Sequence, residues 1–359
     1  MSDQRGFFDL EHHYERLSAA GDPLERLAGA VNFEAFRYRL EKALKRSDRS
    51  KGGRPPYDPV LMFKVLILQA LYNLSDAQAE YMIKDRLSFL RFLGLGLDDA
   101  VPDSTTIWLF REQLVKANAM EKLFRRFDKV LTEKGYLAMS GQIVDATLVP
   151  APRQHNDDGE KEAIKAGKTA AEIWPEEPAK ARQKDVSARW TVKTSKAKPR
   201  ADGKVQADLA VPVFGYKNHI VIDRKHGFVR RFKVSDAARH DGAVLRQIVT
   251  RDNTASDVWA DTAYRSKKNE DWLRKMGRVS RIHQRKPKGR PMPKRTARAN
   301  GAKSKVRSAV EHVFADQKQR MGLLVRTVGI DRASMKIGMV NLAYNMRRLI
   351  WIDAREAPA

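Results

Sequence analysis

The chain of 359 residues contains no cysteine, which excludes disulfide bonds, thiolate-ligated zinc and a cysteine nucleophile together. Acidic residues are outnumbered, with 44 Asp and Glu against 69 Lys and Arg. Long apolar runs are also lacking, since no stretch approaches the roughly 18 unbroken apolar residues that a bilayer-spanning helix needs. The opening segment, MSDQRGFFDLEHHYERL, is mixed in charge rather than basic and then apolar. We therefore expect neither a membrane partner nor a secretory signal.

The composition instead describes a folded and strongly basic chain. Hydrophobic residues make up 42% of the sequence, which is enough for a real core, and the formal net charge is +25. An excess of positive charge on a folded chain indicates a polyanionic partner, with nucleic acid as the first candidate. We therefore expect an intracellular protein that works on nucleic acid.

The N-terminal third carries the signals of helices. Asp58 before Pro59 is typical of an N-cap and a first helical position, and the run that follows is apolar on nearly all sides, as in a buried helix. Ser75 and Gln78 have the spacing of a capping box, and another helix is expected to open at 102–106. Two interpretations remain open for these helices: a helix-turn-helix that reads DNA, or a bundle used for dimerisation.

From about residue 136 the pattern changes to strands and helices in alternation. Two of the apolar segments end in an aspartate, Asp145 in one and Asp261 in the other. Residues 152–208 are polar and rich in Lys, Glu, Ala and Pro, and we interpret them as a long insertion that is partly ordered at best. The expected elements are strands at 142–145, 211–223, 227–234, 257–261 and 279–284, and helices at 241–249, 267–275, 305–321 and 334–351.

The helix expected at 305–321 places one carboxylate between two cations. Arg307, Glu311 and Lys318 share a helical face beside an apolar stripe. Taken singly, each acid has an ordinary role, since Glu311 fits a surface ion pair and strand-end aspartates cap turns. Taken together, Asp145, Asp261 and Glu311 indicate three hard oxygen ligands at the open end of a sheet, which suit Mg²⁺. On a strongly basic chain this cluster favours metal-dependent phosphodiester chemistry on DNA.

The same segments resemble DDE transposases of the insertion-sequence-five family. The similar stretches are IVDATLVPAP, FGYKNHIVID, WADTAYRS and the N-terminal GRPPYDPVLMFKVLILQALYNLSDAQAEYMI, and the resemblance runs from about Gly53 to Leu349. The family's superfamily has a signature of Tyr, two residues, Arg, three residues, Glu, six residues, Lys. Arg307, Glu311 and Lys318 match it in spacing, whereas Ser304 occupies the tyrosine position. In related transposases that region helps to hold a flipped base or a DNA hairpin, so the resemblance leaves a hairpin step undecided.

The resemblance implies a fold and a division into domains. We expect an α/β chain with a ribonuclease-H-like mixed sheet flanked by helices, preceded by an all-helical N-terminal domain for DNA-end binding or dimerisation. The corresponding ranges are 1–135 for the helical domain, 136–352 for the catalytic domain with the insertion at about 152–208, and 353–359 for a tail.

The resemblance also implies an activity, cofactors and partners. The chain would bind the terminal inverted repeats of an insertion sequence and catalyse metal-dependent DNA cleavage and strand transfer. Two Mg²⁺ ions, with Mn²⁺ able to substitute, would act at the site. The partners would be double-stranded DNA, both repeat and target, and a second copy of the chain in a homodimer on DNA. The expected location is the bacterial cytoplasm, in association with the nucleoid.

Site residues follow from the matching segments. Asp145, Asp261 and Glu311 would be the catalytic metal ligands. The residues expected to bind DNA lie in the family-like segments or in basic stretches, and they are Arg307, Lys318, Lys217, His219, Tyr264, Arg265, Arg54, Lys294 and Arg295. Ordinary alternatives stand beside some of these roles: His219 fits a packing histidine, and the basic stretch at 286–305 fits a solvated linker as well as a DNA clamp.

Two rival functions remain from the sequence. One is a catalytically silent, transposase-derived protein that binds DNA as a repressor or architectural factor. The other is a ribonuclease-H-like nuclease, which cuts without requiring specific ends and joins no strands. DNA cleavage in the presence of Mg²⁺ or Mn²⁺ separates the first rival from a transposase, and strand joining separates the second.

Overall fold

The computed structural model describes residues 9–44, 55–195 and 209–356. The chain forms two compact units. The first comprises Met1–Tyr136, Gln319–Gly322 and Gly338–Ala359, and the second comprises Leu137–Lys318 and Leu323–Ile337. The expected basic contact at Arg54 lies outside the described residues.

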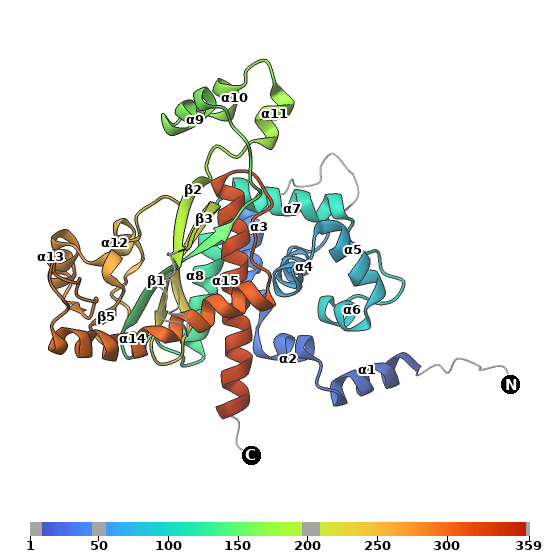
Figure 1. The fold of residues 1–359 in the computed structure, drawn as a ribbon. Coiled ribbons are helices and arrows are strands. Elements are labelled where there is room, and N and C mark those ends of the chain that lie inside the picture. The colour runs from blue at the N-terminus through green and yellow to red at the C-terminus, as the bar shows by residue number, and fades with distance from the viewer. Residues whose placement is uncertain (1–8, 45–54, 196–208, 357–359) are drawn as a thin grey trace, which may run out of the picture. The chain divides into compact units, whose positions relative to one another are not determined.

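The first unit is helical in its described residues, as the sequence predicts (Figure 1). Asp58 caps α4 by accepting the backbone N–H groups of Val60 and Leu61, and the capping box of Ser75 and Gln78 opens α5. The helices are α1 (Asp9–Ala19), α2 (Pro23–Ala30), η1 (Phe33–Phe36), α3 (Arg37–Leu44), α4 (Pro59–Tyr72), α5 (Asp76–Asp85), α6 (Leu87–Leu93), α7 (Ser104–Lys116), α8 (Met120–Glu133) and the part of α15 (Ile330–Glu356) from Gly338 onward.

Helix α4 forms the centre of this unit. Most of its side chains are buried, as expected from its apolar sequence, and the helix ends at Asn73 in the left-handed conformation. Arg111 of α7 forms an ion pair of 2.7 Å with Asp76 of α5, which fixes two of the helices that the sequence assigns to a helix-turn-helix or a bundle. In the described parts of the chain, no single helix is long and apolar enough to cross a membrane, although the bent pair α4 and α5 together reaches that length and composition.

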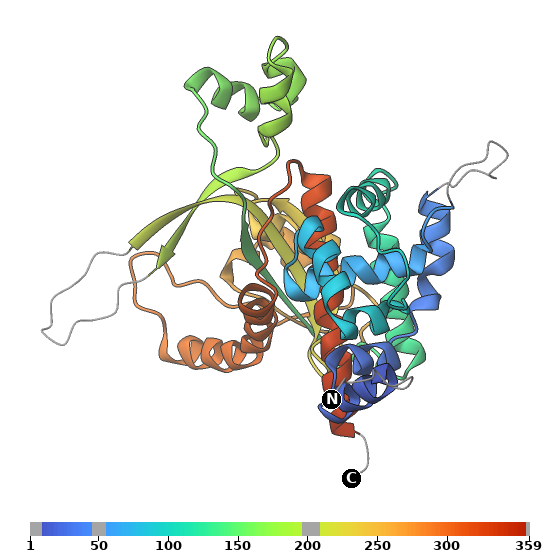
Figure 2. The ribbon, with the colours of Figure 1, turned by 90° about the vertical axis from the view of Figure 1, so that its right-hand side faces the viewer.

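The second unit contains a mixed sheet in the order β2-β3-β1-β5-β6, with β4 paired to β3. Strand β1 runs antiparallel to β3 and parallel to β5, and β3 is antiparallel to both β2 and β4. The first half of β3 pairs with β2 alone, so these two strands extend from the sheet as a ribbon (Figure 2). The strands are β1 (Gln142–Pro150), β2 (Arg189–Ser195), β3 (Leu209–Asp223), β4 (Val229–Asp236), β5 (Asp257–Trp259) and β6 (Val279–Ser280).

Helices cover both faces of this sheet. Val144 and Val221 are register partners, and they pack with Leu245 and Ile248 of α12 in a core that includes α13. The neighbouring residue Asp145 points to the opposite face, because side chains alternate along a strand, and that face meets α14. The remaining helices are α9 (Asp158–Lys165), α10 (Ala170–Ile173), α11 (Pro178–Gln183), η2 (Asp241–Ala243), α12 (Leu245–Ile248), η3 (Thr262–Tyr264), α13 (Lys267–Lys275), α14 (Lys294–Ala315) and the π-helix η4 (Asp316–Arg320).

Three expectations about individual elements are wrong. The first strand does not end at Asp145 but continues to Pro150, because residues 146–150 pair with β3. The insertion was expected to be partly ordered at best, but its described part, residues 152–195, contains three helices and β2. The basic stretch at 286–305 is not entirely a loop, because α14 begins at Lys294, after the N-cap Pro293. The Ala, Lys and Arg residues of this stretch are strong helix formers.

Candidate active site

Asp145 lies in the middle of β1 with both carboxylate oxygens engaged. Oδ1 accepts the N–H of Ala146 at 2.9 Å, and Oδ2 accepts Nη2 of Arg307 from α14 at 2.8 Å. The side chains of Asp145 and Arg307 are each only 16% exposed. Burial raises the pKa of Asp145, although the Arg307 guanidinium opposes this, and the charge of Asp261 raises it further. The two aspartates of the sequence prediction are therefore within electrostatic reach of each other.

Asp261 follows β5 and caps η3, where its Oδ1 accepts the N–H of Ala263 at 2.8 Å. The ordinary role expected for such an aspartate is thus present. The parallel pairing of β1 with β5 explains the proximity to Asp145, because both strands lead to the same edge of the sheet. Capping uses one carboxylate oxygen and leaves the other available for a ligand.

Glu311 lies on α14, one turn after Arg307. Val310, Val313 and Phe314 form the buried stripe of the helix, as the sequence predicts, and Glu311 projects beside it into solvent. Within the described ranges Glu311 has no hydrogen bond or ion pair. Among the same residues, no group of three or more His, Cys, Asp or Glu side chains is arranged to hold a metal ion. The structure therefore brings two of the three predicted acids together and leaves the third exposed on the helix that contacts Asp145.

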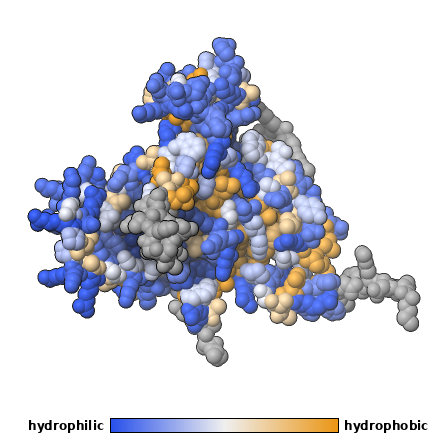
Figure 3. Space-filling model, viewed as in Figure 1, coloured by the Kyte–Doolittle hydropathy of each residue, from blue (hydrophilic) through white to orange (hydrophobic). Residues whose placement is uncertain are grey.

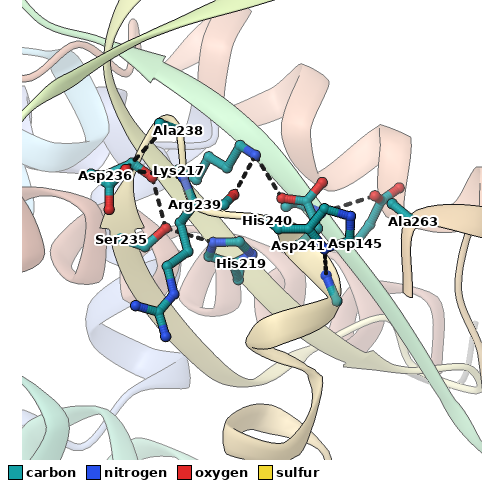
Figure 4. Close-up of polar contacts among 12 residues, drawn as sticks. Asp145, Lys217, His219, Ser235, Asp236, Ala238, Arg239, His240, Asp241 and Ala263 are labelled. Carbon is teal, nitrogen blue, oxygen red and sulfur yellow. Dashed lines mark hydrogen bonds and ion pairs between the residues drawn. The ribbon is translucent and has the colours of Figure 1, made fainter. Parts of the chain in front are cut away.

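A further carboxylate, Asp241, lies at the start of η2. The N-cap of η2 is His240, whose Nδ1 accepts the N–H of Gly242. Asp241 forms an ion pair of 2.8 Å with Lys217 of β3, as Figure 4 shows. Burial raises the pKa of Tyr264, and the charges of Asp145, Asp241 and Asp261 raise it further, so this phenol interacts electrostatically with all three carboxylates. The sequence does carry a signal for Asp241, because it is an acidic residue at the start of a helix that follows a buried strand.

These residues fit a divalent cation. Two neighbouring carboxylates, one of them buried with a raised pKa, form an oxygen donor set in which the negative charges oppose each other. A cation bound between them would relieve that opposition. At present Arg307 supplies the positive charge beside Asp145, and its Nε is buried without a hydrogen-bond partner among the described residues.

The structure places the residues expected to bind DNA in different environments. Lys294 and Arg295 are exposed on the first turn of α14, in a region whose surface is hydrophilic in Figure 3. Lys318 is exposed in the π-helix, where its pKa is lowered by partial burial and by the nearby charge of Lys193. Arg265 is half-buried and donates to the carbonyl of Ile282 at 3.0 Å.

Three other residues expected to bind DNA are occupied or buried. Lys217 donates to the carbonyl of Arg239 and to Asp241, which uses most of its capacity as a donor. His219 and Tyr264 are completely buried, so neither side chain reaches solvent and we do not propose a direct contact with DNA for them. His219 therefore matches the alternative interpretation of the sequence, a histidine that packs in the core. Its Nε2 lies 2.9 Å from Ser235 Oγ.

His219 is expected to make the fold sensitive to acid. Burial lowers its pKa from 6.5 to about 4. Because the unfolded chain takes up this proton near pH 6.5 and the folded chain only near pH 4, the stabilisation is complete above pH 6.5 and is lost as the pH falls through this window. This difference in the pKa of His219 between the unfolded and the folded chain corresponds to about 3 kcal/mol of unfolding free energy. In denaturant titrations at pH 7 and pH 4.5, wild type should lose more stability than His219→Gln; parallel losses would contradict the expectation.

The fold and the site define a class of protein. A mixed sheet flanked by helices, with aspartates at the edge shared by β1 and β5, forms a ribonuclease-H-like core of the kind that DDE transposases use. The family model described as Transposase DDE domain matches residues 136–346, and the model described as Transposase domain (DUF772) matches residues 11–113. The chain therefore belongs to the DDE transposase family, whose members act on DNA and generally use divalent metal ions. No solved structure matches the chain.

Proposed function

We propose that the chain is a cut-and-paste transposase of the insertion-sequence-five type. It binds the terminal inverted repeats of its element, hydrolyses phosphodiester bonds at the element ends, and joins the freed 3′-hydroxyl to target DNA. The observation that carries the proposal is the approach of Asp145 to Asp261 beside the helix of Glu311, in a chain of the DDE family. Asp145, Asp261 and Glu311 would hold Mg²⁺, for which Mn²⁺ would substitute.

Bound divalent ions would activate the attacking oxygen and stabilise the leaving oxygen of the phosphodiester. The protein's own residues perform the remaining tasks. The Ala146 N–H and Arg307 orient Asp145, and the Ala263 N–H orients Asp261. Arg307 presents a guanidinium, whose planar donors suit a DNA phosphate, at the edge where the strand would be cut.

DNA binding is proposed to extend from this edge along α14. Lys294 and Arg295 on its first turn, and Lys318 beyond its end, are exposed cations that would contact phosphates on either side of the scissile bond. The helical residues 1–135 are proposed to recognise the inverted repeat and to form the homodimer that bridges two ends. Binding through several phosphate contacts predicts an affinity that falls steeply with salt.

Glu311→Gln tests the proposal most directly. The substitution keeps the size of an exposed side chain, so the fold and binding to end DNA should remain near wild type. Cleavage should fall at least about 100-fold, because one ligand carboxylate is lost. The measurement is nicking of a labelled inverted-repeat duplex in Mg²⁺ or Mn²⁺, together with a gel-shift assay on the same duplex.

Asp158→Asn is the matched control, because Asp158 is an exposed carboxylate of α9 that forms an ion pair with the neighbouring Lys161. It should cleave like wild type. Unchanged cleavage by Glu311→Gln would remove Glu311 from the site. End binding without any nicking by wild type would instead favour the catalytically silent DNA-binding protein, and cutting of any duplex without strand joining would favour the nuclease.

A further inference from the structure

The two aspartates of the candidate site stand side by side on neighbouring strands. Strand β1 pairs in parallel with β5, and Ile143 is the register partner of Trp259. The backbone of Asp261 is still extended, so the same register, continued by two residues, sets Asp145 beside Asp261. Neighbouring strands lie about 5 Å apart, and register partners project their side chains to the same face of the sheet. The two aspartates therefore begin a row of side chains that crosses the sheet.

His283 continues this row on the far side of Asp261. Strand β6 pairs in parallel with β5, and Val258 is the register partner of Ser280. Three residues further along the two segments lie Asp261 and His283. The pairing holds to that point, because the N–H of His283 donates to the carbonyl of Ala260 at 3.1 Å. Asp145, Asp261 and His283 thus form one row over three adjacent segments of the sheet.

The row lies on the face of the sheet that α14 covers. The residues directly before its three members pack in the core with α12 and α13, on the opposite face, and they are Val144, Ala260 and Ile282. Because side chains alternate along extended segments, the three members of the row point away from that core. Helix α14 crosses the row, since Arg307 donates to Asp145 at one end and Lys303 donates to the carbonyl of Ile282 at the other.

The imidazole of His283 is buried with one nitrogen unpaired. The residue is 9% exposed, and its Nε2 has no hydrogen-bond partner among the residues that the structure describes. A buried nitrogen without a partner costs stability, because it has lost its contact with water and gained nothing in the fold. Asp261 also has a carboxylate oxygen to spare, since only Oδ1 is used to cap η3. A nitrogen and an oxygen with lone pairs to donate therefore lie on neighbouring positions of the row.

We propose that His283 is a ligand of the catalytic divalent cation, and that its Nε2 binds the same ion as the free carboxylate oxygen of Asp261. The inference rests on the proposed function, to which it adds a nitrogen ligand. Among the described residues the row is not arranged around one ion as it stands. Binding therefore requires side chains to rotate, and neither Nε2 nor the free oxygen has a hydrogen bond to break.

The nitrogen ligand has a consequence for the choice of metal. Imidazole binds first-row transition metals well, whereas Mg²⁺ prefers oxygen ligands. The site should therefore bind Mn²⁺ more tightly than Mg²⁺. A neutral imidazole also adds a ligand without adding to the opposition between the negative charges of Asp145 and Asp261.

The experiment uses the untagged full chain loaded with Mn²⁺. Pulsed electron paramagnetic resonance detects a nitrogen nucleus bound to Mn²⁺, and wild type should show this signal. His283→Phe keeps a buried ring but removes its nitrogens, so it should lose the signal and bind Mn²⁺ at least about 10-fold more weakly in calorimetric titration. Its melting temperature without metal should stay close to wild type, because Nε2 has no hydrogen bond to lose. His283→Asn should lose the signal in the same way without needing room for a larger ring.

His226→Phe is the matched control, since His226 is buried to the same extent but lies beside Asp223 in the β3–β4 turn. It should keep the nitrogen signal and the Mn²⁺ affinity of wild type. A wild type that binds Mn²⁺ without a nitrogen signal, or a signal that persists in His283→Phe and His283→Asn, would overturn the inference and leave the proposed function standing. Failure of wild type to bind Mn²⁺ at all would overturn the proposed function.

Discussion

Asp261→Asn should abolish DNA cleavage while leaving the fold intact. Asparagine is as good an N-cap as aspartate, so the hydrogen bond that Asp261 accepts from Ala263 is kept and η3 should form normally. What is lost is the negative charge required of a metal ligand. A loss of about 4 kcal/mol of transition-state stabilisation corresponds to a rate roughly 1,000-fold lower. The measurement is single-turnover cleavage of end DNA, alongside the melting temperature.

Asp157→Asn provides the comparison, because Asp157 caps α9 in the same way but lies in the insertion. Both variants should melt close to wild type, and only Asp261→Asn should lose cleavage. If Asp261→Asn cleaved normally, the carboxylate would be a helix cap and nothing more.

The largest expected effect on stability is at Asp223, an aspartate that also ends a strand and is completely buried. Its carboxylate accepts the N–H groups of His226 and Phe228 and forms an ion pair of 2.9 Å with Arg230. Asp223→Ala should lower the free energy of unfolding by about 3–5 kcal/mol, because a buried ion pair and two backbone hydrogen bonds to the same carboxylate are lost. Denaturant unfolding at neutral pH measures the change.

Asp252→Ala is the matched control. Asp252 forms an ion pair of 3.7 Å with Arg231, the residue after Arg230, and its side chain is 73% exposed. An exposed pair of this kind contributes about 0–1 kcal/mol. Equal destabilisation by the two substitutions would contradict the role assigned to Asp223. Asp223 ends a strand as a catalytic aspartate could, but its hydrogen bonds identify it as the residue that organises the β3–β4 turn.

The sequence correctly predicted the elements that depend on residues close together in the chain. The caps at Asp58 and Ser75 operate over three or four residues, so both helix starts were correct. The apolar stripe of Val310, Val313 and Phe314 was also correct, because burial follows helical periodicity. The start of α14 at Lys294 was missed because a run of cations looks like a solvated loop, although Lys and Arg favour helix once the chain is held at its end.

Strand-end positions and the family pattern both indicated Asp145 and Asp261 as site residues. Their proximity, however, depends on the pairing of β1 with β5, which no local pattern encodes. The position of Asp241 near them depends on the approach of η2 to η3, which the side chain of Asn269 fixes. Spacing along α14 placed Arg307 and Glu311 on one face, yet only the neighbouring strand determines that Arg307 reaches Asp145.

The pairing of β1 with β5 also determines when the two aspartates can meet during folding. Gln142 is the partner of Val258, so the chain must close a loop of more than 100 residues before this part of the sheet forms. Contacts so distant in sequence form slowly and late. A growing chain therefore cannot bring Asp145 and Asp261 together until the segment beyond residue 261 has been made, and any truncation before it removes one of the two aspartates from the proposed metal site.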